Sequence, residues 1–89
     1  MSEDELKKNF LNCFMDLQRA AISFYQNPQG KTHLIFLNHA QGILEKIKDE
    51  KARHFVAIIS QLKDKTSHPS EKQKKYLADE ILTAGILLK

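Results

Sequence analysis

The sequence predicts a small all-α protein, a single domain built as an antiparallel bundle of helices. Three observations lead to this fold class. The 89 residues are enough for one domain with a modest core. The chain has only three glycines and two prolines, so few turns interrupt it. Apolar residues recur at three- and four-residue steps, which is the spacing of helices with one buried face.

Two turn signals divide the chain. Residues 27–30 (NPQG) combine a proline that presets a turn with a glycine that tolerates positive backbone angles. Residues 66–70 (TSHPS) form the second signal, because Pro69 bars the continuation of a helix. One helix is therefore expected before the first signal and one after the second.

The first helix is predicted over residues 3–26. Ser2 is a suitable N-cap, and Glu5, three residues on, completes a capping box. The apolar positions of this helix define a core-facing stripe of seven residues. They are Leu6, Phe10, Cys13, Phe14, Leu17, Ala21 and Phe24.

The last helix is predicted over residues 71–88, with Ser70 as its cap and Gln73 as the second half of a capping box. Its core stripe is again spaced at three and four residues. It consists of Leu77, Ile81, Ala84 and Leu88, with Tyr76 and Leu87 beside it.

The middle of the chain supports two interpretations. A single helix of about 34 residues would be roughly 50 Å long, several times the usual length. It would also place Lys48 and Lys51 in the centre of an apolar stripe. We therefore favour two helices, over residues 32–48 and 50–65, with Asp49 capping the second. Three helices with one long central helix are the alternative, since residues 48–51 tolerate a helix well.

The residue types needed for catalysis or for metal binding do not occur in a suitable pattern. None of the four histidines, His33, His39, His54 and His68, lies four residues from another, as a helical zinc pair would. We expect them on the surface or at helix ends. Cys13 shares the core stripe and is expected to be a structural residue rather than a nucleophile. We predict no catalytic site, no metal site and no cofactor, and hence no enzyme.

Composition bounds the location of the protein. The acidic first five residues lack the apolar segment of a signal peptide. No stretch approaches the roughly 18 consecutive apolar residues of a membrane span. A lone cysteine fits a reducing compartment. These features lead us to expect a cytoplasmic protein that does not bind membranes.

The two outer helices carry more apolar surface than a small bundle needs. On the first helix, Leu11, Met15 and Ile22 lie well away from the core stripe. On the last helix, Ala78, Leu82 and Ile86 form a similar row, and Gly85 beside it would let another helix approach closely. Ile35 adds to this surplus. Apolar patches of this extent commonly mark interfaces, although burial inside the same bundle is the alternative.

The main functional hypothesis is a non-enzymatic interaction module such as a regulator, adaptor, inhibitor or chaperone. It would bind another protein, or a second copy of itself as a homodimer, through these apolar rows. The competing hypothesis is binding of nucleic acid or another anion, because lysines that could neutralise phosphates cluster late in the chain. They are Lys63, Lys65, Lys72, Lys74 and Lys75. The mild net charge of +3 and the scarcity of arginine weigh against nucleic acid.

Overall fold

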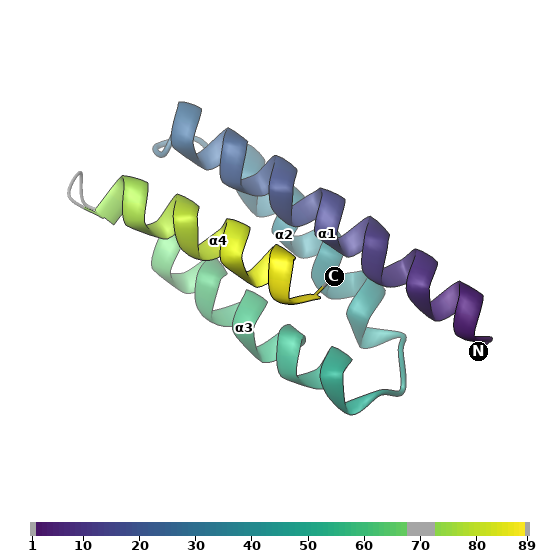
Figure 1. Ribbon diagram of the computed structural model, residues 1–89. Coiled ribbons are helices and arrows are strands. Elements are labelled where there is room, and N and C mark those ends of the chain that lie inside the picture. The colour runs from purple at the N-terminus through teal and green to yellow at the C-terminus, as the bar shows by residue number, and fades with distance from the viewer. Residues whose placement is uncertain (1, 68–72, 89) are drawn as a thin grey trace.

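The computed structural model describes residues 2–67 and 73–88, and in these residues it contains four helices and no strands. The helices are α1 (Glu3–Gln26), α2 (Thr32–Glu45), α3 (Glu50–Ser67) and α4 (Lys74–Leu88). Successive helices run in opposite directions, as Figure 1 shows. The predicted all-α bundle is therefore confirmed, with four helices, and the alternative of one long central helix is wrong.

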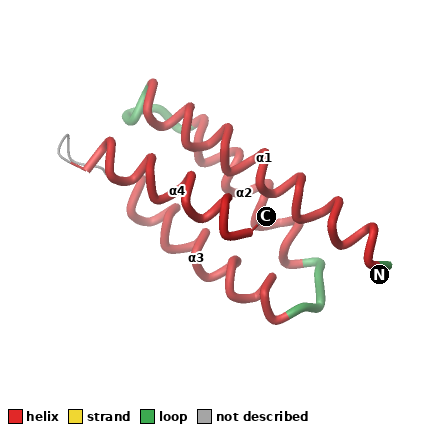
Figure 2. Tube along the Cα trace, viewed as in Figure 1, coloured by secondary structure: helices red, strands yellow, loops and turns green. Residues whose placement is uncertain are grey.

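The four helices form a four-sided bundle. α1 packs against α2 on one side and against α4 on the other, while α3 lies between α2 and α4 on the opposite side. Short loops join α1 to α2 and α2 to α3 (Figure 2). α4 packs more extensively against α1 than against α3. The molecule measures 42 × 19 × 18 Å, and the first turns of α1 extend past the end of α4 (Figure 1).

The core lies along the axis of this bundle and draws on all four helices. The stripe predicted for α1 faces it, with Leu6 and Phe10 partly buried near one end. The predicted stripe of α4 is buried at the three positions whose side chains are described, Leu77, Ile81 and Ala84. The largest fully buried apolar side chains are Leu17, Phe24, Leu37, Leu44, Ile59 and Ile81.

Polar residues cap two of the helices as the sequence predicts. The Ser2 Oγ accepts a hydrogen bond of 3.2 Å from the Glu5 N–H at the start of α1. At the start of α3, an Asp49 side-chain oxygen accepts one of 2.8 Å from the Lys51 N–H. Both bonds satisfy backbone donors that have no partner within the helix. The predicted cap at Ser70 lies outside the described residues.

α2 ends at Glu45, three residues before the predicted boundary. There the chain tightens, because the Lys46 N–H donates to the Ile43 carbonyl and the Ile47 N–H donates to the Leu44 carbonyl. This turn places Ile47 in the core at 5% exposure. In a continued helix, Lys48 would lie within the apolar stripe. The break after α2 leaves its side chain exposed instead.

Gly85 sets the close contact between α4 and α1. A Cβ atom at this position would lie 3.4 Å from Leu17 Cβ and 3.4 Å from Phe14 Cδ2. The sequence pattern indicated that another helix approaches here, and that helix is α1 of the same chain.

None of the helices in the described part of the chain has the length and apolar character needed to cross a membrane.

Candidate protein-binding surface

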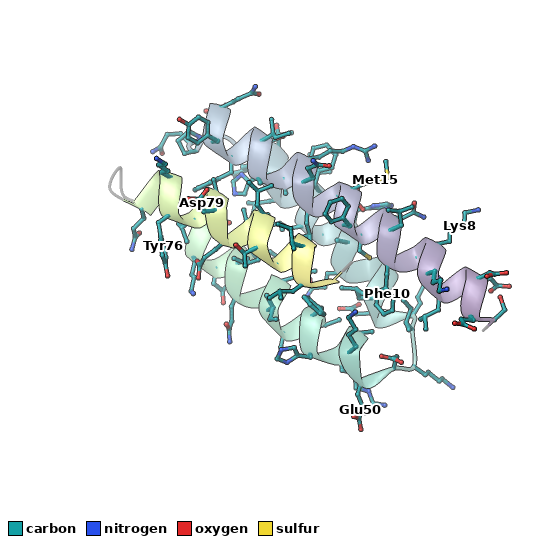
Figure 3. The ribbon with its side chains drawn as sticks, in the orientation of Figure 1. Lys8, Phe10, Met15, Glu50, Tyr76 and Asp79 are labelled. Atoms are coloured by element: carbon teal, nitrogen blue, oxygen red, sulfur yellow. The ribbon has the colours of Figure 1, made fainter. Side chains whose placement is uncertain are left out.

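The apolar row predicted on α1 is exposed. Leu11, Met15 and Ile22 expose 48%, 38% and 51% of their surface. Met15 points away from the bundle, whereas Phe10 on the same helix points towards it (Figure 3). The helical repeat explains this difference, since the row lies on the side of α1 that faces neither α2 nor the core. These side chains form a ridge along α1.

A groove between α1 and α4 runs beside this ridge. Leu82 and Ile86 of α4 are exposed at its edge. The groove consists of two hollows that share Leu82. The first, of about 130 Å³, is lined by Phe14, Gln18, Leu82, Gly85 and Ile86. The second, of about 210 Å³, is lined by Ala21, Ile22, Tyr25, Gln26, Ala78, Asp79 and Leu82.

The ridge and the groove lie side by side, and we call them together the α1–α4 surface. Its exposed apolar side chains are Leu11, Met15, Ile22, Tyr25, Leu82 and Ile86. Tyr25 was not part of the sequence prediction. Its spacing of three residues from Ile22 would have placed it on the same side of α1.

Two residues predicted for the interface lie elsewhere. Ala78 is only 4% exposed and belongs to the core, because its short side chain lies close against α1. Ile35 is exposed at 66%, but it lies on α2, which packs against α1 and α3 and not against α4. It is exposed as predicted, but it is separate from the α1–α4 surface.

Most of the charged residues lie at the edge of the α1–α4 surface, and Asp79 also lines its second hollow. Lys8 extends from the outer side of α1 (Figure 3), and Lys75 and Asp79 are exposed on α4. Arg19 borders the ridge and lies 3.6 Å from the Asp16 carboxylate. An uncharged centre with a charged rim is the usual arrangement of a protein interface.

A second groove separates α3 from α4, the pair of neighbouring helices that packs least extensively. It has a volume of about 310 Å³, and its lining includes Ile58, Leu62, Tyr76 and Leu87. Figure 3 shows Tyr76 projecting from α4. The sequence placed Tyr76 and Leu87 beside the core stripe, whereas both expose about two thirds of their surface because α3 does not close over them.

The lysine segment is partly engaged within the bundle. The Lys63 ammonium donates a 2.8 Å hydrogen bond to the Gln41 side-chain carbonyl. The Lys65 ammonium lies 3.5 Å from the Glu80 carboxylate, across the α3–α4 groove. Lys75 is exposed. Lys72 and the side chain of Lys74 lie outside the described part of the structure.

Cys13 has the environment of a structural residue. Its side chain is fully buried, and its Sγ lies 3.6 Å from the Ala40 carbonyl oxygen. Burial, with a smaller contribution from the negative charge of Asp16, raises the pKa of the Cys13 thiol to about 12. The nucleophilic thiolate is therefore scarce at neutral pH.

Two histidines make contacts that the sequence did not predict. The His39 Nδ1 lies 2.5 Å from an oxygen of Asp16, a buried carboxylate on the neighbouring helix α1. His33 lies at a helix end, one of the two places expected for the histidines, but it is 1% exposed and packs edge-on against Phe24. Among the described residues, no group of three or more histidines, cysteines or carboxylates could hold a metal ion.

Comparison of the chain with family models, with curated proteins and with solved structures gave no match. Its function must therefore be argued from the geometry of its surfaces.

Proposed function

We propose that this protein is a non-catalytic interaction module whose α1–α4 surface binds an apolar helix. The observation that carries this proposal is the exposure of the ridge formed by Leu11, Met15 and Ile22 next to an apolar groove. A groove between two antiparallel helices accepts a third helix whose apolar residues recur on one face. Contiguous exposed apolar surface of this kind is unusual on a protein that acts alone.

The chemistry of the surface supports a helix rather than a polar ligand. The two hollows are lined mainly by carbon, and their polar groups are the side chains of Gln18, Gln26 and Asp79 and the hydroxyl of Tyr25. Tyrosine and methionine are enriched in the centres of protein interfaces. The rigid tyrosine ring and the flexible methionine side chain both exclude water there. Burying this surface supplies binding free energy at about 25 cal/mol per Å², before the costs of association.

Other functions have weaker support. Phosphate binding through the lysine segment would require Lys63 and Lys65 to leave the partners described above. Nucleophilic catalysis by Cys13 would require a thiolate that burial opposes. His39 has an exposed ring held by Asp16, and the thiol on which the Asp16 charge acts, that of Cys13, is buried with a raised pKa.

Position-specific photo-crosslinking in the cells that make the protein tests this proposal. We expect a benzophenone side chain at Met15 or at Leu82 to form protein adducts. The control position is Asn38, which is exposed on α2 away from this surface. Adducts at Met15 and Leu82 but not at Asn38 are the expected result. Equal adduct formation at all three positions, or none at any of them, would overturn the proposal.

A further inference from the structure

We infer that the helix bound by the α1–α4 surface is α1 of a second copy of this chain, so that the protein forms a twofold symmetric dimer. This inference rests on the proposed function, since it names the partner of the same surface. Three observations carry it: the area that the single chain leaves accessible, the pairing of a ridge with a groove of matching length, and the distribution of charge.

The single chain exposes more surface than its mass requires. Its accessible surface is 5956 Å², whereas a compact monomer of 10.3 kDa exposes about 5,350 Å². The difference is about 600 Å², or three quarters of the roughly 800 Å² that each partner buries in a stable interface of standard size. The exposed side chains of the α1–α4 surface contribute to the accessible area, as do Tyr76 and Leu87 in the α3–α4 groove.

The α1–α4 surface is complementary to itself. The ridge runs along α1 from Leu11 to Ile22, and the groove beside it runs from Phe14 to Gln26. They span twelve and thirteen residues, or about 16 Å and about 18 Å of helix. In a twofold contact the same patch serves both partners. The ridge of each copy can therefore occupy the groove of the other, and both are buried in one step.

The charges of the surface permit such a contact. No charged side chain lies on the ridge, and among the described residues Asp79 is the one charged residue that lines either hollow. Few ions therefore have to lose their water in the centre of the interface. The rim carries both signs, with Lys8 and Lys75 as cations and Asp79 as an anion. Because each copy has a net charge of +3, added salt screens their weak repulsion and should slightly strengthen the dimer.

Sedimentation equilibrium of the purified chain over a dilution series tests the inference. We expect a particle of twice the 10.3 kDa monomer mass that dissociates on dilution. Met15→Lys and Leu82→Lys should each weaken the dimer by about thirtyfold or more, the effect of a central interface residue. Ile35→Lys is the control, because Ile35 is also apolar and, at 66%, more exposed than Met15 or Leu82, but lies on α2. It should leave the dimer intact.

The outcomes separate this inference from the proposed function. A wild-type chain that stays monomeric at every concentration overturns the dimer. In that case the proposed function still stands if crosslinking at Met15 yields adducts with a different protein. If added salt weakens the complex with that protein, the partner is acidic. A dimer that both lysine variants leave unchanged also overturns the inference. Circular dichroism checks that the variants keep their helices, and the milder Met15→Gln and Leu82→Gln replace any variant that does not fold.

Discussion

His33 lies in the first turn of α2 at the point where the ends of α1 and α3 meet. Its ring packs edge-on against Phe24, with 4.8 Å between the ring centroids. Neither ring nitrogen has a hydrogen-bond partner among the described residues. Burial lowers the pKa of His33 below its ordinary value, and the nearby backbone of Thr66 opposes this shift in part. The folded protein therefore favours the neutral ring.

This burial predicts a loss of stability in mild acid. Below an ordinary histidine pKa of about 6.5, the unfolded chain binds a proton at this position before the folded chain does. The free energy of unfolding should be highest above that pH and should fall as the pH drops towards the lowered pKa of folded His33. Urea unfolding at about pH 7.5 and about pH 5.5 measures the difference.

Two variants assign this pH dependence to one residue. His33→Phe should reduce the difference in unfolding free energy between the two pH values, because a phenylalanine cannot bind the proton. His54→Gln is the control, since His54 is exposed on α3, and it should retain the difference. An unchanged pH dependence in His33→Phe would show that His33 does not cause it.

Asp16 is the other residue whose burial needs an explanation. Its side chain is 4% exposed, yet it is a carboxylate within the helix bundle. His39 from α2 and Arg19 from the next turn of α1 supply its partners. Buried charges are costly unless they are paired. The His39 contact supplies such a partner from α2, so it links α1 to α2.

At the scale of the element, α1 and α4 pack closely together through small residues. A Cβ atom at Gly85 would lie at van der Waals distance from Phe14 and Leu17. Ala21 of α1 and Ala78 of α4 are both buried in the core. Short side chains on both helices allow a close approach. That approach fixes the floor of the groove and leaves the longer Leu82 side chain at its edge.

Substitutions at Gly85 test this contact. Gly85→Ala should be tolerated and can stabilise the helix by up to about 1 kcal/mol, because alanine favours a helix over glycine. Gly85→Leu should destabilise the protein by about 1–3 kcal/mol, because the added atoms overfill the space beside Phe14 and Leu17. Urea unfolding of both variants gives the comparison. Equal stability of Gly85→Leu and the wild type would contradict the close contact.

The sequence predicted the helices well because their signals are local. Proline, glycine, capping residues and apolar spacing each act within a few residues of the chain. The break after α2 followed from two lysines that a longer helix would have buried. α2 ends three residues before the predicted boundary because a tight turn brings Ile47 into the core. A helical wheel does not describe such a turn.

At the scale of the whole molecule, the sequence predicted the exposed rows but not their neighbours. A helical wheel gives the direction of Leu11, Met15 and Ile22 relative to the core of their own helix. It does not say which helices adjoin α4. For that reason Ala78 and Leu82, one turn apart on α4, were grouped together, although the shorter one is buried against α1 and the longer one is exposed.

The same limit applies to Ile35 and to His33. Ile35 is apolar and exposed, as predicted, but the bundle places α2 on the far side of α1 from α4. His33 is buried because the ends of two other helices cover it. Both outcomes depend on contacts between distant parts of the chain, and these are set by the packing of complete helices rather than by any local signal.

Amide NMR spectra recorded from micromolar to millimolar concentration test the central claim most directly, because they report on every element of the chain at once. We expect the signals that move with concentration to belong to α1 between Leu11 and Tyr25 and to α4 around Leu82. Signals of α2 around Ile35 should stay in place. A spectrum that does not change with concentration, or changes centred on α2 or α3, would contradict self-association through the α1–α4 surface.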